Sequence, residues 1–189
     1  MPVSNNQIIG AVLLAGVGYY LYTQGTGDSS DTTVDSGNSP GIGTQIMAAV
    51  SGYKNVNDGP IWVPVLNAAE AQFNLPADIL CATAFQESSF LTNVINGTQP
   101  SSDGLSLGIM QLQTAYYPSV NVAVPFSQAD VEQQIQDAAQ TFATNYAALG
   151  SWPETIAAFN QGLNGVQTNG ITSTSYVAKI LANCPAANV

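Results

Sequence analysis

The chain lacks most of the side chains that bind anions or act as bases near neutral pH. It contains no histidine and no arginine, and its only cations are Lys54 and Lys179, against twelve Asp and Glu residues. Without histidine, Ser-His-Asp and Cys-His catalytic groups are excluded, and the commonest zinc ligand is missing. A net charge of −10 also leaves no basic surface for nucleic acid, which is not an expected partner. Catalysis would therefore fall to carboxylates, hydroxyls and amides, and we expect neither a metal nor a cofactor.

Cysteine is also scarce, because Cys81 and Cys184 are the only two in the chain. In an exported domain this pair could form a disulfide, which would tie the C-terminus to the helix that carries Cys81. Cys81 could equally be a small core residue. The sequence leaves these two alternatives open.

Residues 8–22 form an apolar run without a charged residue. As a helix the run would span about 23 Å, slightly less than the roughly 30 Å of a hydrocarbon core. No basic segment precedes it and no small-x-small cleavage site follows it. A retained single-span anchor over residues 1–23 is therefore favoured over a cleaved signal peptide or a buried helix. Ala11 and Ala15 have the spacing of a helix-pairing motif, and no Lys or Arg lies near the run to indicate its orientation.

Residues 24–43 are rich in Gly, Ser, Thr and Asp, a composition that cannot bury a core and that predicts a flexible linker. After it, apolar residues recur at helical spacing, which predicts a mainly α-helical domain over residues 44–189. The predicted core consists of Leu80, Ala84, Ile135, Phe142, Ile156 and Ile180. We expect helices over residues 44–50, 62–73, 76–87, 127–149, from 151 onward and 174–181, with a weak strand signal over 120–124.

Three of these helices begin at residues that commonly cap a helix. Ser127 and Asp130 form a capping box. Ser151, which is followed by Pro153 and Glu154, and Thr174 are the expected N-caps of the last two helices.

Glu87 lies in the apolar helical stretch of residues 80–90 and shares a helix face with Leu80, Thr83 and Ala84. That face should point to the core, which places Glu87 where the core meets a cleft. Burial and the helix C-terminal dipole both disfavour the carboxylate and raise its pKa. A carboxylic acid that stays protonated near neutral pH can act as a general acid, whereas the more common role for a Glu at a helix end is a solvated surface charge.

Four short motifs follow one another along the chain: Glu87-Ser88-Ser89-Phe90, Gly108-Ile109-Met110-Gln111, Ala158-Phe159-Asn160-Gln161-Gly162 and Tyr176-Val177-Ala178-Lys179-Ile180. In this order they resemble the catalytic domain of the lytic transglycosylases of the soluble type and of goose-type lysozymes. The similarity extends over about residues 60–182. Phe159 stands where that family usually has Tyr, and residues 91–102 are a longer connection than usual.

The resemblance implies a lysozyme-like α-helical fold and peptidoglycan as the substrate. Glu87 would be the catalytic acid, and Tyr176 would contact it. Glu87 would protonate the glycosidic oxygen between N-acetylmuramic acid and N-acetylglucosamine, then take the C6 hydroxyl proton to leave a 1,6-anhydro product. If water attacked instead, the enzyme would be a lysozyme, for which Asp103 is the nearby second acid. The substrate-binding residues implied are Ser88, Ser106, Met110, Gln111, Asn160 and Tyr176.

The chain as a whole is therefore expected to be a membrane-anchored, peptidoglycan-degrading enzyme. Its catalytic domain would face the cell wall, in the bacterial envelope or on a virion, and open the wall locally for a phage or an envelope apparatus. Residues 8–22 would contact lipid, and pairing of these helices or a larger virion or envelope assembly would supply further partners. Two alternatives are an inactive structural or wall-binding protein with the same fold, and a membrane-active viral protein driven by residues 8–22.

Overall fold

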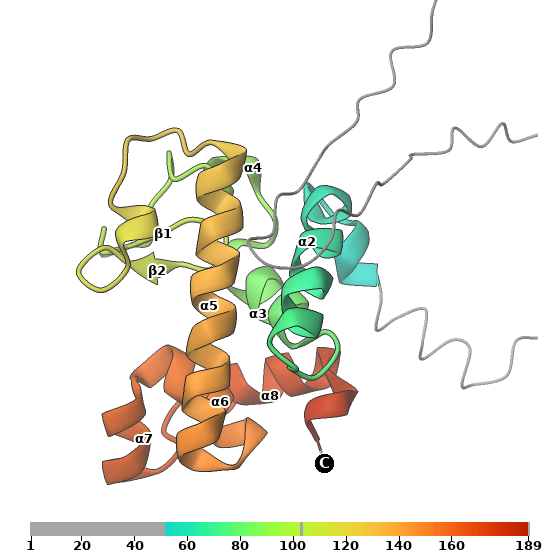
Figure 1. Cartoon of the computed structure of the whole chain (residues 1–189), viewed down its shortest axis with the longest axis vertical. Coiled ribbons are helices and arrows are strands. Elements are labelled where there is room, and N and C mark those ends of the chain that lie inside the picture. Colours follow the sequence, from blue (N-terminus) through green and yellow to red (C-terminus); the bar gives the residue numbers. More distant parts are fainter. Residues whose placement is uncertain (1–51, 103, 189) are drawn as a thin grey trace, which may run out of the picture. The chain divides into compact units, whose positions relative to one another are not determined.

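The computed structural model describes residues 52–102 and 104–188 and shows a mainly α-helical domain (Figure 1). The predicted anchor, linker and 44–50 helix lie outside the described residues, as does Asp103. Within the described part of the chain, no helix is long and apolar enough to span a membrane.

The helices follow one another with short connections and a single small hairpin. The hairpin pairs β1 (Ser106–Leu107) with β2 (Leu112–Gln113) in antiparallel register, Ser106 opposite Gln113. The α-helices are α2 (Gly59–Gln72), α3 (Ile79–Ser88), α4 (Thr92–Ile95), α5 (Gln128–Leu149), α6 (Trp152–Gln161), α7 (Leu163–Asn169) and α8 (Thr174–Asn183). Short 3-10 turns η1 (Gly52–Asn55), η2 (Pro118–Val120) and η3 (Pro185–Ala187) complete the described elements.

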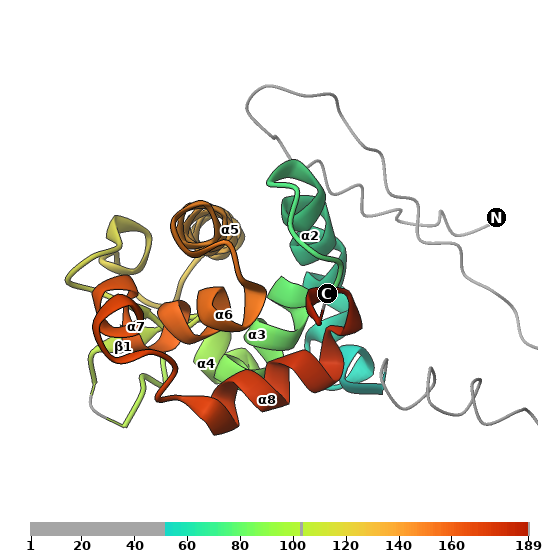
Figure 2. The ribbon, with the colours of Figure 1, turned by 90° about the horizontal axis from the view of Figure 1, so that it is seen from below.

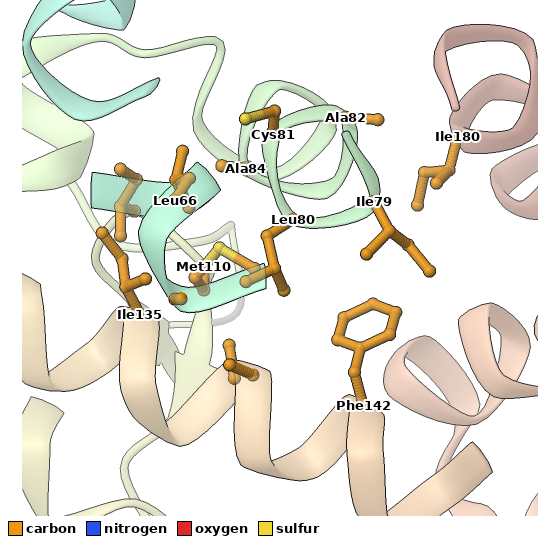
Figure 3. Packing of buried hydrophobic residues seen from close by; sticks show 14 of the residues in the cluster. Leu66, Ile79, Leu80, Cys81, Ala82, Ala84, Met110, Ile135, Phe142 and Ile180 are labelled. Atoms are coloured by element: carbon orange, nitrogen blue, oxygen red, sulfur yellow. The ribbon is translucent and has the colours of Figure 1, made fainter. Parts of the chain in front are cut away.

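Helix α3 lies at the centre of the domain and packs against α2, α5 and α8 (Figures 1 and 2). Figure 3 shows Phe142 of α5 pointing toward Leu80 and Ile79 of α3, and Ile135 of α5 pointing toward Leu66 of α2. Ile180 of α8 lies beside Ile79. The six core residues predicted from the sequence are all fully buried. Because α3 is covered on several sides, its side chains are buried from Ile79 to Ala84, and its last turn is held in a fixed position.

The start of α3 is held by a buried carboxylate. Glu70 of α2 is only 4 % exposed, and its two oxygens accept hydrogen bonds from the backbone N–H groups of Asp78 (2.9 Å), Leu80 (2.7 Å) and Cys81 (3.3 Å). The first N–H groups of a helix have no partner within it, and a negative charge there also interacts favourably with the helix dipole. Glu70 therefore caps α3 from a neighbouring helix and fixes the angle between the two.

Several boundaries differ from the sequence prediction. Helix α2 begins three residues earlier than predicted, at Gly59, with Pro60 in its first turn. Helix α3 begins at Ile79 rather than Pro76, because Asp78 has a positive φ of 75° and breaks any continuation toward the N-terminus. The segment 120–124 is not a strand: η2 covers its first residue, and the rest is irregular.

The predicted N-cap position is correct for two helices of three, Ser127 of α5 and Ser151 of α6. Ser127 and Asp130 form the predicted capping box at the start of α5. Ser151 precedes α6, but its side chain makes no capping hydrogen bond. Thr174 is the first residue of α8 rather than its cap, which is Ser173.

The two cysteines are both buried and are not joined by a disulfide. The thiol of Cys81 donates to Asn67 Oδ1 and that of Cys184 to the Ala77 carbonyl, each at 3.2 Å. Burial raises the pKa of the Cys81 thiol well above its usual value and that of Cys184 to about 12, so both are neutral core residues here.

Replacing Glu70 with Ala is expected to destabilise the domain by about 2–4 kcal/mol, because several buried N–H groups at the start of α3 would lose their acceptor. Denaturant unfolding followed by circular dichroism measures the loss. The control is Glu132→Ala, since Glu132 bonds only to the exposed side chain of Gln128, and its effect should stay within about 0.5 kcal/mol. Equal effects of the two substitutions would show that Glu70 is not a structural cap.

Candidate active site

A cleft of about 670 Å³ opens beside the C-terminal end of α3. The hairpin and the segment after it contribute to its lining, as do α5, α6 and the start of α7. Most of the lining is uncharged and polar, a chemistry suited to a ligand rich in hydroxyl and amide groups. The lining residues are Glu87, Ser101, Ser106, Gln111, Leu112, Gln113, Tyr116, Tyr117, Thr141, Asn145, Ala158, Phe159, Asn160, Gln161, Gly162 and Leu163.

Glu87 is the one carboxylic acid among the described residues that line this cleft. It lies in the last turn of α3, next to the point where the chain leaves the helix through two residues with positive φ, Ser89 and Phe90. Burial raises the pKa of Glu87 to about 7, and a hydrogen bond from Tyr176 opposes part of this shift. At neutral pH the Glu87 side chain is therefore divided between its acid and carboxylate forms, which suits a group that must both donate and accept a proton.

Tyr176 of α8 is the partner of Glu87. Its hydroxyl donates to Glu87 Oε1 at 2.6 Å, across 89 residues of sequence. Burial and the neighbouring Glu87 charge raise the pKa of Tyr176 well above its usual value. The tyrosine therefore remains a hydrogen-bond donor, and it orients the carboxyl group from the side of α8.

The loop between the two strands brings Gln111 into the cleft. Gly108 has a positive φ of 80°, and Gln134 of α5 packs directly against it, with its side-chain oxygen accepting the N–H of Ile109 at 3.3 Å. The Gln111 side chain in turn donates to the Gly108 carbonyl at 2.9 Å. Gly108 is thus required both by its backbone conformation and by the space that Gln134 occupies.

Asn160 and Gln161 lie at the C-terminal end of α6 and have different surroundings. Asn160 is exposed and faces the cleft, where its amide is accessible to a ligand. The Gln161 oxygen accepts hydrogen bonds from the backbone and hydroxyl groups of Thr172 and Ser173, and its Nε2 donates to the Gly170 carbonyl. Gln161 therefore fixes the loop that leads into α8, and through that helix it supports Tyr176.

The structure brings together four of the six residues predicted to bind substrate, together with Glu87. Ser106, Gln111 and Asn160 line the cleft, and Tyr176 contacts Glu87. The remaining two, Ser88 and Met110, do not line it. Ser88 is 3 % exposed. Its hydroxyl donates to the Ala84 carbonyl and accepts the Phe90 N–H, so it holds the end of α3 and is not available to a ligand. Met110 is fully buried in the core between α2, α3 and α5 (Figure 3).

The wall that α5 contributes to the cleft was not predicted from the sequence. Thr141 and Asn145 line the cleft from one face of this helix, and Tyr117 donates or accepts a 3.0 Å hydrogen bond with Thr141. Asn145 is 6 % exposed despite its polar amide. The sequence did contain a sign of this wall: Thr141 and Asn145 are polar, lie four residues apart on one helix face, and flank the predicted core residue Phe142.

A second cluster of acidic and sulfur ligands lies apart from the cleft. Ligand atoms of Glu70, Asp78 and Cys81 come within 4.8 Å of one another. Both Glu70 oxygens already accept backbone N–H groups, and Asp78 forms an ion pair with Lys54. These groups are engaged in holding the start of α3, so their arrangement does not indicate a metal site.

Comparison with protein families shows that residues 64–180 match the model of the transglycosylase SLT domain. The match extends from α2 to α8 and includes Glu87, the hairpin loop, the end of α6 and Tyr176. A comparison with curated proteins finds no match.

Replacing Gly108 with Ala is expected to destabilise the domain more than the same change at Gly104. Both glycines have φ near +70 to +80°, so each substitution costs about 1–2 kcal/mol for the left-handed backbone. A Cβ at Gly108 would also lie 1.9 Å from Gln134 Oε1, whereas a Cβ at Gly104 has nothing within 4 Å. The overpacking should add about 1–3 kcal/mol. Denaturant unfolding of the two variants measures the difference, and equal losses would contradict this account of the loop.

Proposed function

Because the chain belongs to the transglycosylase SLT domain family, whose members are lytic transglycosylases that cleave glycosidic bonds of peptidoglycan, we propose that it cuts the β-1,4 bond between N-acetylmuramic acid and N-acetylglucosamine. The observation that carries the proposal is Glu87, a partly buried acid in a polar cleft, with a pKa of about 7 and a hydrogen bond from Tyr176. The cleft supplies the neutral hydroxyl and amide groups that bind sugars.

In the first step, protonated Glu87 transfers its proton to the glycosidic oxygen, and N-acetylglucosamine leaves with the bonding electron pair. Positive charge develops at C1 of the muramic acid ring. The carbonyl oxygen of the substrate's own 2-acetamido group stabilises that charge, so the mechanism needs no protein nucleophile. Glu87 is left as a carboxylate, which the Tyr176 hydroxyl stabilises through its hydrogen bond.

In the second step, the Glu87 carboxylate takes the proton from the C6 hydroxyl, and the C6 oxygen closes on C1 to give the 1,6-anhydro ring. Attack by water would instead give a reducing sugar, and goose-type lysozymes employ extra carboxylates around that water. Among the described residues that line the cleft, Glu87 is the only carboxylic acid. Asp103, the candidate second acid for a water-directed reaction, lies outside the described residues. The anhydro-forming reaction is proposed because the members of the family are lytic transglycosylases.

We further propose that residues 1–23 hold the enzyme at a membrane, in the bacterial envelope or in a virion, with the domain facing the wall. Support comes from the charge-free apolar run of residues 8–22 and from the polar linker behind it. A linker of about 20 residues gives a root-mean-square reach near 25 Å. A chain with net charge −10 lacks a basic surface for adhering to an anionic wall, and a tether would supply the local concentration instead.

The alternative is a wall-binding protein of the same fold without turnover. Phe159, which replaces the family's usual Tyr, is the feature that would suit it. In the structure the Phe159 ring stacks on Phe142 at a centroid distance of 4.9 Å, so it contributes to packing beside the cleft. The Glu87–Tyr176 pair does not involve Phe159 and is intact. A binding protein would gain nothing from a desolvated acid in its cleft, which favours the enzyme.

Glu87→Gln is expected to abolish cleavage, because the amide cannot donate the catalytic proton. The full-length protein and the variant are incubated with purified peptidoglycan, and the released muropeptides are identified by mass spectrometry. Wild-type protein should release anhydro-muropeptides, and the variant at least about 100-fold less. Glu132→Gln on the outer side of α5 is the matched control and should retain full activity. Reducing ends in place of anhydro ends would make the enzyme a lysozyme, and no release by folded wild-type protein would favour the wall-binding alternative.

The rate of cleavage is expected to fall as the pH rises through about 7, because Glu87 must be protonated to act and its pKa is raised to about 7. In Tyr176→Phe the carboxylate loses the hydrogen bond that stabilises it, so the pKa of Glu87 should rise further. The alkaline limb of the pH–rate profile should then move to higher pH, at a lower maximal rate.

Tyr146→Phe is the control for that profile, since Tyr146 stacks on Trp152 outside the cleft and should leave the limb in place. If the alkaline limb of the Tyr176→Phe profile stays at the wild-type pH or moves to lower pH, the role assigned to Tyr176 is contradicted.

A further inference from the structure

A second, smaller hollow of about 240 Å³ adjoins the cleft. It is lined by Thr114, Ala115, Tyr116, Tyr117, Pro118 and Asn121, and it shares both tyrosines with the cleft. The segment that follows β2 therefore lines both hollows. A polymeric substrate that occupies the cleft continues beyond it, and this hollow lies directly beside the cleft.

The two tyrosines on this segment differ sharply in their surroundings. The Tyr117 hydroxyl is hydrogen-bonded to Thr141, and its ring packs against the core, so it forms part of the wall. Tyr116 is 73 % exposed, more than any other large apolar side chain in the part of the chain that the structure describes. Its backbone N–H is nevertheless fixed by the Gln113 carbonyl at 3.0 Å. The Tyr116 ring is thus presented to solvent from an anchored backbone, and it contributes little to the core.

The lining of the second hollow has a definite chemical character. Every residue in it is uncharged, and it combines aromatic and proline rings with the hydroxyl of Thr114 and the amide of Asn121. A pyranose ring has an apolar face of C–H groups and an edge of hydroxyls, and it matches such a surface. An anionic peptide would find no cation there.

We propose that Tyr116 is a sugar-binding residue, whose ring packs against a further pyranose of the glycan strand in the second hollow. This rests on the proposed function, since the strand must lie in the cleft for the next ring to reach Tyr116. The contact is made with the strand away from the cleaved bond. It holds long strands more tightly and leaves the chemical step at Glu87 unchanged.

The test uses peptide-free glycan strands, prepared with an amidase and separated by length, and the full-length protein. Tyr116→Ala should raise KM for long strands about tenfold, with kcat within about twofold of wild type. For the shortest strands that wild type cleaves, the increase in KM should be clearly smaller than for long strands. Tyr116→Phe should behave as wild type, because the ring rather than the hydroxyl makes the contact. Ile61→Ala is the control, because Ile61 on α2 is the next most exposed large apolar side chain among the described residues, at 64 %, and lines neither hollow.

A binding measurement separates this proposal from the proposed function. In the Glu87→Gln background, adding Tyr116→Ala should weaken binding of long strands about tenfold by calorimetry. If wild type cleaves and Tyr116→Ala has no effect on KM or binding, the sugar contact is refuted and the enzymatic function stands. If wild type does not cleave but binding depends on Tyr116, the enzymatic function fails and the sugar contact stands. An effect seen only with strands that carry stem peptides would overturn the proposal in favour of a peptide contact.

Discussion

The hydrogen bonds from the start of α3 to the Glu70 carboxylate are the interaction on which the site depends. They fix one end of a short central helix whose other end carries Glu87. A helix of ten residues rises only about 15 Å, so any change in its starting angle is transmitted to its last turn. The cover of α2, α5 and α8 then fixes its rotation. One buried acid thereby positions another: Glu70 stabilises the helix as an acceptor, and Glu87 lies at the edge of the core with the Tyr176 hydroxyl as its hydrogen-bond donor.

Each wall of the cleft is held by contacts that lie behind it. Gln134 holds the hairpin loop, so Gln111 can face the cleft while Met110 is buried beneath it. Gln161 holds the loop before α8 and so supports Tyr176. In both cases a glutamine side chain bonds to backbone groups of a neighbouring segment, a use that needs no charge. This fits a chain that has only two cations and no histidine to make such contacts.

The sequence was sufficient to predict the features that repeat or that follow local rules. The core of α3, α5 and α6, the capping box at Ser127 and the acid at Glu87 were all accessible from spacing and motif order. The start of α3 was not, because the cap at Glu70 comes from another helix, eight to eleven residues earlier. The burial of Met110 and Ser88 was not predicted either. Residues in a family motif can contact the ligand or can hold the backbone in shape, and the motif itself does not distinguish the two roles. The wall formed by Thr141 and Asn145 depends on how α5 crosses the hairpin segment, which no local pattern encodes.

The scarcity of positive charge bears directly on the chemistry of Glu87. A Lys or Arg near a carboxyl group lowers its pKa, whereas among the described residues the group that lowers the pKa of Glu87 is the neutral hydroxyl of Tyr176. Desolvation therefore dominates, and burial is enough to keep part of this acid protonated near neutral pH. Among the described residues, neither the cleft nor the second hollow is lined by a cation, and Glu87 is the one ionisable acid in the two linings. A surface without positive charge suits the uncharged rings of a glycan strand better than an anionic peptide, which agrees with the proposed sugar contact at Tyr116.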